Sequence, residues 1–347
     1  MAQALEMTPY ARVMAAIRGE PFDVYPAITP TSVVTEGVMQ RANAYFPTAH
    51  TRASEMAALA AVGHDYFGFD SVMPYFSILL ESAALGAEID WGSIDQTPRV
   101  VKTAISQAGH YAAPAGFLKR QHFQRLLSAV SILHKKYRGR VAVIGKVIGP
   151  WTLAYHLYGV EKLVLDTILE PEQTKAFICE LSKIPMAFAK AQFDAGADIV
   201  TWAEHCTADL VSAAIYEDFV APIHRQAAVE LQSAGPLVLH ICGNIMDRLD
   251  MIADTGIQML HLDSRNDIKR ATELVGDRIA LTGCINNPFT LAQGKPSDVY
   301  KEVCGCIHKG IRLISPECAV PCRVPDENLL TLVKTAHQRR GPGACLG

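Results

Sequence analysis

The sequence predicts an α/β fold: a single parallel (β/α)8 barrel of the TIM type spanning residues 1–347. Eight short apolar segments have the length and composition of buried strands. From the fourth strand onward, one helical segment separates each strand from the next. No linker rich in Pro, Ser or Gly divides the chain, and no repeat of fixed period is present. In such a barrel, functional side chains gather at the carboxyl ends of the strands.

The first part of the chain is expected to supply three strands. A helix is predicted over residues 7–20, with Thr8 as its N-cap and the Gly19-Glu20-Pro21 break as its end. Pro26 lacks a backbone N–H, which argues against a central, fully hydrogen-bonded position for the first strand. The predicted strands are 23–29, 66–72 and 141–147, the next predicted helices are 52–62 and 121–137, and a hairpin excursion is predicted at about 86–102.

The second part of the chain alternates helices and strands. Residues 151–167 are read as helix and loop, and Gly196 is a suitable C-cap for the long helix 171–195. The Gly-rich tail 341–347 is expected to be frayed. The predicted strands are 198–203, 236–242, 258–263, 278–283 and 311–315, and the remaining predicted helices are 216–233, 246–254, 268–275, 296–309 and 325–339.

Composition limits the classes of function. Half of the residues are hydrophobic and 19% are charged, as in a compact globular protein. The net charge is −3 without a block of Lys or Arg, so no nucleic-acid partner is expected. No secretory signal and no apolar run of bilayer length are present, so we expect a cytoplasmic protein without a membrane partner. Nine scattered cysteines indicate reduced thiols rather than a disulfide framework.

A His-x-Cys pair ends the fifth predicted strand. Side chains two positions apart in an extended chain lie on the same face, so His240 and Cys242 can reach one atom. An imidazole nitrogen and a thiolate suit a borderline ion such as zinc. The end of the eighth strand offers Cys318 as a third ligand, with Cys322 as a competitor. The alternative is a buried cysteine that packs as an apolar residue beside a hydrogen-bonded histidine.

The same strand ends bring other reactive side chains to this mouth: Glu204, His205, Asp263 and Tyr75. Because neighbouring residues of a strand point in opposite directions, only part of the Glu204-His205-Cys206 run can face the mouth. Scaffolding by salt bridges or hydrogen bonds is the alternative role for Glu204 and His205. Among the other cysteines, Cys284 at a strand end is a weaker ligand candidate, and Cys304 and Cys306 diverge on one helix. No Gly-x-Gly-x-x-Gly, P-loop or Gly-x-Ser-x-Gly pattern is present.

Four motifs together resemble the methylcobamide:coenzyme M methyltransferases of the uroporphyrinogen decarboxylase superfamily. The resemblance runs through nearly the whole chain and assigns the third ligand to Cys318, because Cys322 falls where that family tends to have Pro. The motifs are residues 15–21, the His240-Ile241-Cys242-Gly243-Asn244 segment, residues 287–291 followed by Gly294, and residues 316–328 with Pro316-Glu317-Cys318. Glu204-His205 and Asp263 stand at positions where this chain departs from the family pattern.

The resemblance implies an enzyme that moves a methyl group from a methylated corrinoid, held on a separate corrinoid protein, to a small thiol, first of all coenzyme M. Zn²⁺ held by His240, Cys242 and Cys318 would take the thiol at an open position and remove its proton. Tyr75 and Asn244 are candidates for cofactor contacts, and Glu204, His205 and Asp263 are further catalytic candidates.

Three alternatives remain open from the sequence. The acceptor is another thiol or tetrahydrofolate, the protein is a zinc-containing adaptor of a corrinoid protein without turnover, or it is a decarboxylase of the uroporphyrinogen decarboxylase type. Against the last, no Arg-rich motif that would bind substrate carboxylates lies between Pro26 and Phe46.

Overall fold

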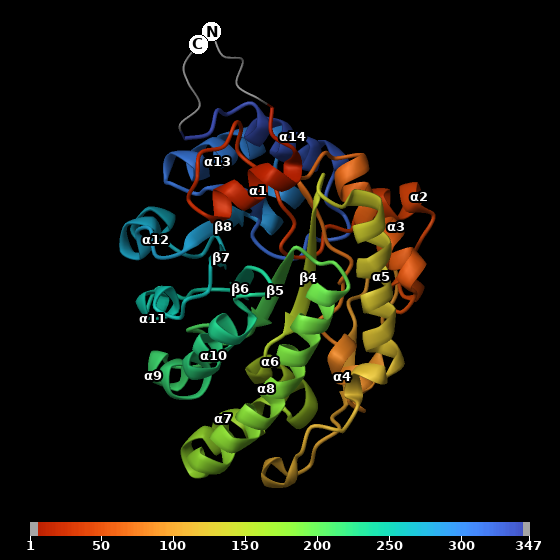
Figure 1. The fold of residues 1–347 in the computed structure, drawn as a ribbon, viewed down its shortest axis with the longest axis vertical. Helices are drawn as coiled ribbons and strands as arrows, with labels where there is room; N and C mark the ends of the chain where they lie inside the picture. The colour runs from red at the N-terminus through yellow and green to blue at the C-terminus, as the bar shows by residue number, and fades with distance from the viewer. Residues whose placement is uncertain (1–5, 343–347) are drawn as a thin grey trace.

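The computed structural model describes residues 6–342 and shows a curled parallel sheet surrounded by helices (Figure 1). The sheet order is β1-β4-β5-β6-β7-β8-β9, and each neighbouring pair is parallel. The predicted α/β barrel is therefore confirmed. Its strands are β1 (Ser71–Val72), β4 (Ala142–Ile148), β5 (Ile199–Glu204), β6 (Leu237–Ile241), β7 (Met259–Leu262), β8 (Ala280–Ile285) and β9 (Leu313–Pro316).

The eighth position of the barrel is closed by single bridges rather than by a regular strand. The predicted strand 23–29 is wrong as a continuous element, because Ala27 makes only an isolated parallel bridge to Ile314 of β9. On the other side, Asp70 donates its backbone N–H to the Ala27 carbonyl at 2.7 Å, just before β1. Pro26 cannot donate a backbone hydrogen bond, and this interrupts the ladder here. The segment still joins the two edges of the sheet.

Helices cover the outside of the sheet, and most match the predicted segments. Thr8 caps α1, with its Oγ1 accepting a hydrogen bond from the Ala11 amide at 3.1 Å. Helices α2 and α4 lie outside every predicted helix, and the short helix α9 comes directly before the predicted helix 216–233. The helices are α1 (Pro9–Ile17), α2 (Glu36–Ala42), α3 (Ala53–Asp65), α4 (Leu80–Ala84), α5 (Gln121–Tyr137), α6 (Pro150–Tyr158), α7 (Val160–Leu169), α8 (Pro171–Asp194), α9 (Ala213–Ile215), α10 (Ala221–Leu231), α11 (Leu249–Ala253), α12 (Ile268–Val275), α13 (Pro296–His308) and α14 (Asp326–His337).

A hairpin excursion at about 86–102 and a frayed tail at 341–347 were expected. A two-stranded antiparallel hairpin, β2 (Glu88–Asp90) and β3 (Arg99–Lys102), lies within residues 86–102. Of the predicted tail, Gly341 is buried and donates its N–H to the Asp23 carbonyl at 3.0 Å, and residues 343–347 lie outside the described part of the chain.

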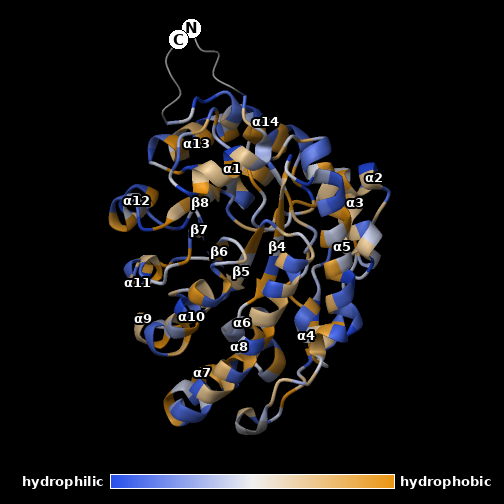
Figure 2. Cartoon of the chain, viewed as in Figure 1, coloured by the Kyte–Doolittle hydropathy of each residue, from blue (hydrophilic) through white to orange (hydrophobic). Residues whose placement is uncertain are grey.

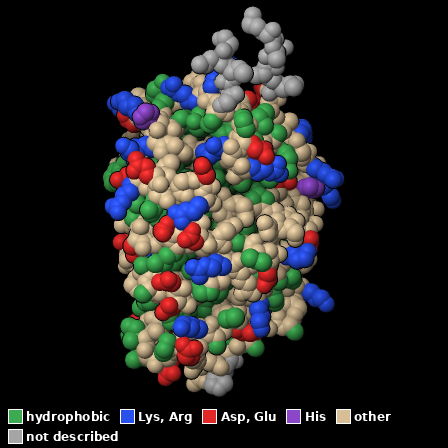
Figure 3. All heavy atoms as spheres, turned by 60° about the vertical axis from the view of Figure 1, so that its left-hand side comes forward, with side chains coloured by type: hydrophobic (Ala, Val, Ile, Leu, Met, Phe, Trp, Pro, Cys, Tyr) green, Lys and Arg blue, Asp and Glu red, His purple; other side chains and the backbone are tan. Residues whose placement is uncertain are grey.

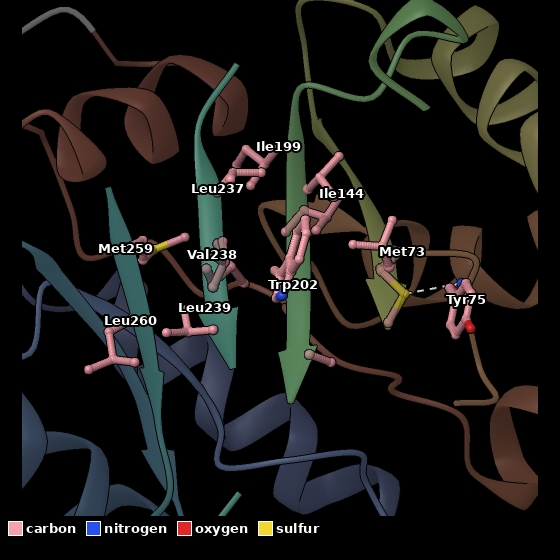
Figure 4. Close-up of a cluster of buried hydrophobic side chains, with 14 of the residues drawn as sticks. Met73, Tyr75, Ile144, Ile199, Trp202, Leu237, Val238, Leu239, Met259 and Leu260 are labelled. Atoms are coloured by element: carbon pink, nitrogen blue, oxygen red, sulfur yellow. Dashed lines mark hydrogen bonds between the residues drawn. The ribbon is translucent and has the colours of Figure 1, made fainter. Parts of the chain in front are cut away.

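Apolar strands form the centre of the molecule. Every residue of β4, β5 and β6 is buried, as expected for parallel strands covered on both faces. Hydrophobic colour follows the strands and the inner sides of the helices (Figure 2). Figure 4 shows the side chains of Ile144, Trp202 and Val238, among others, packed along neighbouring strands. Burial of this core drives folding and holds the strand ends that carry the site.

The outer surface is mixed in charge. On the face drawn in Figure 3, Lys and Arg side chains are interspersed with Asp and Glu. Exposed ion pairs of this kind contribute little to stability, so the core carries most of it. No helix within residues 6–342 combines the length and apolar character needed to cross a bilayer.

Candidate functional site

Three side chains converge at the carboxyl ends of β6 and β9. His240 Nε2 lies 3.0 Å from Cys242 Sγ and 3.6 Å from Cys318 Sγ, and the two sulfurs are 3.2 Å apart. Within the described residues this is a group of three metal-ligating side chains whose ligand atoms all lie within 4.8 Å of one another. The predicted ligands thus come together from positions 78 residues apart, although their role as ligands remains a prediction.

Local backbone features set this geometry. His240 and Cys242 lie on the same face because β6 is extended up to Ile241. Gly243 has φ +86°, a conformation that favours glycine, and it turns the chain directly after Cys242. The Gly243 amide donates to Asp263 Oδ2 at 2.9 Å, which joins the ends of β6 and β7. Asp263 therefore fixes the turn that presents Cys242.

Neighbouring contacts hold Cys318 on the other side of the cluster. Glu317, next to it in sequence, accepts hydrogen bonds from the backbone amides of Asn287 at 2.8 Å and Ser264 at 3.0 Å. These bonds tie the segment after β9 to the ends of β8 and β7. The Cys318 position thus depends on a carboxylate that accepts hydrogen bonds from two backbone amides.

The two cysteines influence each other's ionisation. A hydrogen bond from Cys242 lowers the pKa of Cys318 well below its usual range, although burial opposes this shift. The pKa of Cys242 is raised, first by its hydrogen bond to Cys318 and then by burial. The Cys242 thiol therefore stabilises the Cys318 thiolate by donating its proton in this hydrogen bond. A divalent ion would replace that proton and allow both sulfurs to be thiolates.

A small cavity of about 260 Å³ opens onto the cluster, and His205, Cys242, Gly243 and Asp263 are among its lining residues. His205 Nδ1 is hydrogen-bonded to the Tyr155 hydroxyl. Burial lowers the pKa of His205, so its ring is neutral at neutral pH. His205 and Asp263, two of the further catalytic candidates, therefore line the same cavity as the candidate metal ligand Cys242.

Glu204 lies on the opposite side of β5 from this cavity. Its Oε2 accepts hydrogen bonds from the Thr152 amide at 2.9 Å and the Thr152 hydroxyl at 2.7 Å, at the start of α6. The residue is fully buried, and Trp202, on the same face of β5, packs against His224 of α10. These contacts make Glu204 a scaffold for α6, the alternative to a catalytic role that the sequence left open for it. Its predicted catalytic role is not supported by this position.

The two predicted cofactor contacts differ in exposure and in their hydrogen-bond partners. Tyr75 is fully buried, and its hydroxyl is hydrogen-bonded to the Glu81 carboxylate. In Figure 4 its ring lies beside Met73, whose sulfur accepts the Tyr75 amide at 3.1 Å. Asn244 is exposed, and its Oδ1 accepts the Met246 amide at 3.0 Å. Cofactor binding by these residues stays a prediction.

The remaining cysteines do not join the cluster. Cys322 lies beside a separate cavity of about 610 Å³. Cys284 Sγ lies 3.3 Å from Cys306 Sγ, between β8 and α13, and both residues are buried. The candidate metal centre is thus formed with Cys318 rather than with its two competitors, Cys322 and Cys284.

Three buried residues with basic side chains were not singled out from the sequence. Lys146 is buried within β4, a signal that a lysine in the apolar 141–147 segment could have given. His261 packs 4.6 Å from the His240 ring, centroid to centroid. His50 lines the cavity of about 610 Å³ with both ring nitrogens unpaired within the described residues. Nothing in the local sequence marks His50.

Fold and site together define a parallel α/β barrel with a candidate soft-metal centre at its mouth. The sequence model for uroporphyrinogen decarboxylase (URO-D) matches residues 8–339. The chain therefore belongs to the uroporphyrinogen decarboxylase family, which confirms the family predicted from its motifs.

Within this family the chain is similar to methyltransferases over nearly its whole length. A methylated-thiol–coenzyme M methyltransferase of Methanosarcina mazei is 31% identical over 334 residues, covering 96% of this chain and 90% of that protein. The methylcobamide:CoM methyltransferase MtbA of Methanosarcina acetivorans is also 31% identical over 334 residues, covering 95% and 98%.

Structural comparison agrees with these sequence comparisons. The solved structure of a methyltransferase from Methanosarcina mazei has a TM-score of 0.92 at 28% identity and covers 96% of this chain and 99% of that one. By contrast, a uroporphyrinogen decarboxylase of Syntrophotalea carbinolica is 22% identical over 291 residues, covering 79% of this chain and 81% of that protein.

Proposed function

We propose that this chain is a zinc-dependent methyltransferase. It would move a methyl group from a methylated corrinoid, carried by a separate corrinoid protein, to the sulfur of a small thiol, with coenzyme M as the first candidate. The observation that carries the proposal is the convergence of His240 Nε2 with the sulfurs of Cys242 and Cys318, in a chain whose relatives are named methylcobamide:CoM methyltransferases.

The donor set fits zinc. One imidazole nitrogen and two thiolates are ligands that Zn²⁺ prefers, and three protein ligands leave a fourth position for a substrate. His240, Cys242 and Cys318 would hold the ion, and their two negative charges would balance it. When bound, zinc would supply the positive charge that favours loss of the thiol proton.

Side chains around the cluster have separable roles in this proposal. Both Asp263 oxygens accept backbone amides, from Gly243 at 2.9 Å and Arg265 at 2.9 Å, so Asp263 positions the Cys242 turn instead of exchanging protons. His205 is a neutral imidazole on the same cavity wall, and its Nδ1 is already bonded to Tyr155. We assign His205 Nε2 the role of receiving the thiol proton and passing it to solvent.

The reaction balances as a methyl transfer. The thiolate sulfur forms a bond to the methyl carbon, and the carbon–cobalt bond breaks with its electron pair remaining on the corrinoid cobalt. The products are a methyl thioether, a corrinoid reduced by two electrons, and the proton released from the thiol.

We further propose a cytoplasmic location, where the eight described cysteines, all free, would stay reduced.

An acceptor panel tests the proposal. Purified protein with measured zinc content is mixed with methylcobalamin and, separately, with coenzyme M, other thiols or tetrahydrofolate, and the loss of methyl–cobalt absorbance is followed. Methyl transfer to coenzyme M by zinc-loaded protein is the expected result. Transfer only to tetrahydrofolate or another thiol would change the acceptor, and absence of transfer to every acceptor would overturn the enzyme proposal in favour of an adaptor.

A further inference from the structure

Lys146 is a buried basic residue that has no role in the methyl transfer proposed above. It lies in β4 at the register position of Thr201 in β5, two residues before Ile148. Ile148 pairs with Ala203, which in turn pairs with His240 of β6. Gly145, next to Lys146, faces Gln192 of the outer helix α8, so strand alternation directs Lys146 into the barrel.

The ammonium group lies among candidate site residues without a partner of its own. Only 4% of the Lys146 surface is exposed, and its Nζ lies 5.4 Å from the centroid of the Tyr75 ring. Among the residues that the structure describes, no hydrogen bond or ion pair involves Nζ, and the hydrogen bonds of Lys146 to Gln192 use backbone atoms. A buried, unpaired charge is costly, so a native site that retains one normally provides an anion.

The strand register shows which part of the barrel mouth that anion would occupy. Burial lowers the pKa of Lys146, and the sulfurs of Cys318 and Cys242 oppose this effect more than Glu81 does. In the sheet, Lys146 lies on the inner face of β4 two residues before Ile148, and Ile148 is in register, through Ala203 of β5, with His240 of the cluster. Glu81 already accepts hydrogen bonds from the Tyr75 hydroxyl and from the Ile148 amide at 3.0 Å.

Metal binding would leave Lys146 in need of a partner. With a divalent ion at the cluster, the charges of two thiolates are neutralised by the ion, and they no longer act as counter-ions for the lysine. A group that supplies a negative charge near Nζ would then be favoured. A short thiol bound by its sulfur at the cluster can place an anionic tail within reach of the four-carbon side chain of Lys146.

We propose that Lys146 binds the anionic end of the thiol acceptor, so that the site selects short thiols bearing a sulfonate or a carboxylate over uncharged thiols of the same length. This inference rests on the proposed function, because it requires a thiol at the cluster. It adds the residue that recognises the substrate. The competing role, a cation that only offsets the thiolate charge, would act on every thiol alike.

Substrate discrimination tests the inference. For wild type and Lys146→Met, kcat/KM is measured with 2-mercaptoethanesulfonate, 3-mercaptopropionate and uncharged 2-mercaptoethanol, and the binding of each thiol to zinc-loaded protein is measured by calorimetry. Loss of one charge-assisted contact predicts that the preference for the anionic thiols over 2-mercaptoethanol falls by about 10- to 100-fold. Lys146→Arg should retain part of the preference.

Controls separate this inference from the proposed function. Lys162→Met removes a lysine whose Nζ also faces a tyrosine ring, 5.5 Å from the Tyr158 centroid, but on the exposed surface, and it should keep the preference. Zinc content and circular dichroism show whether the Lys146→Met protein has folded. If it has not, the inference is tested by the wild type alone, which should prefer the anionic thiols to 2-mercaptoethanol. A preference unchanged in Lys146→Met, or a wild type that favours the uncharged thiol, would overturn the inference while leaving thiol methylation intact.

Discussion

Single atoms decide the chemistry at this barrel mouth. His240 has its Nε2 3.0 Å from Cys242 Sγ, while its Nδ1 is buried without a hydrogen-bond partner within the described residues. The Nε2 side of the ring is thus directed at the two sulfurs. A metal held here would depend on this imidazole orientation, which contact with the His261 ring helps to fix.

Removing either sulfur should remove the metal. Cys242→Ala and Cys318→Ala each leave a two-residue site, and we expect zinc occupancy to fall by at least about 10-fold, with methyl transfer lost. Metal analysis after dialysis, together with the methylcobalamin assay, measures both effects. Cys322→Ala is the matched control, because Cys322 lies outside the three-residue cluster and should keep zinc and activity. Full zinc occupancy in Cys242→Ala or Cys318→Ala would contradict the ligand set.

Short-range patterns predicted part of the site, and three-dimensional packing determined the rest. The convergence of His240 with Cys242 follows from the period-two alternation of a strand, which is visible in the sequence. The position of Cys318 needed the family resemblance, because no local rule connects residues 78 positions apart. Lys146 stands in the middle of β4, where the rule that places functional groups at strand ends does not mark it. The direction of the Glu204 side chain depends on which face of β5 turns outward, and the sequence alone does not determine this.

At the scale of elements, β5 and α6 are joined by a buried carboxylate. Glu204 serves as a non-local cap for α6, accepting the Thr152 amide at 2.9 Å and its hydroxyl at 2.7 Å. Side chains at the helix start do not provide this cap, since the residue before α6 is Gly149. The negative charge also lies at the positive end of the helix dipole.

Replacing this carboxylate should mainly reduce stability. Glu204→Gln places an amide N–H near backbone donors and should lower the free energy of unfolding by about 1–3 kcal/mol, as measured by urea denaturation. Glu172→Gln, on an 85% exposed side chain paired with Lys175, should change it by less than about 0.5 kcal/mol. If Glu204→Gln lost turnover at unchanged stability and zinc content, the scaffold role would be wrong and a direct chemical role would regain support.

Helices were predicted correctly where the hydrophobic residues recur at helical spacing over a long, uninterrupted segment. Helix α5 has the predicted bounds, Gln121–Tyr137, because its amphipathic pattern is long and uninterrupted. The segment 23–29 failed as a strand because a few apolar residues beside Pro26 satisfy a composition rule without providing a continuous ladder. The short helices α2 and α4 were missed because seven and five residues carry too few turns to show a helical period.

For the whole molecule, one ionic cluster closes the end of the barrel opposite the site. In α1, Arg12 Nε lies 2.7 Å from Asp23 Oδ1, and Arg12 Nη1 lies 2.6 Å from Asp70 Oδ1. Asp70 directly precedes β1. Asp70 also accepts hydrogen bonds from the Ala27 amide at 2.8 Å and from His337 of α14 at 2.8 Å. Residues from the first helix, the closing segment, the loop before the first strand and the last helix thus meet at one group of charges.

This cluster should make the stability of the protein sensitive to acid. Burial alone would raise the pKa of Asp23, but hydrogen bonds from Arg12 and from the Met7 and Val24 amides lower it to about 2. A carboxyl with a depressed folded-state pKa contributes stability above its unfolded pKa, near 4, and loses it as pH falls toward 2. The expected contribution is about 2 kcal/mol at neutral pH, of which about 1 kcal/mol is lost by pH 3.

Urea denaturation at pH 7, 5, 4 and 3 tests this expectation on wild type and Asp23→Asn. The variant should be less stable at pH 7, and its difference from wild type should narrow steadily below pH 4, because protonation of Asp23 in the wild type removes the same charge as the substitution. Asp194→Asn is the control: its carboxylate pairs with Lys190 on the surface of α8, with both side chains 66% exposed, and it should change stability little. A difference between wild type and Asp23→Asn that stayed constant from pH 7 to pH 3 would show that the Asp23 charge does not hold this end of the barrel together.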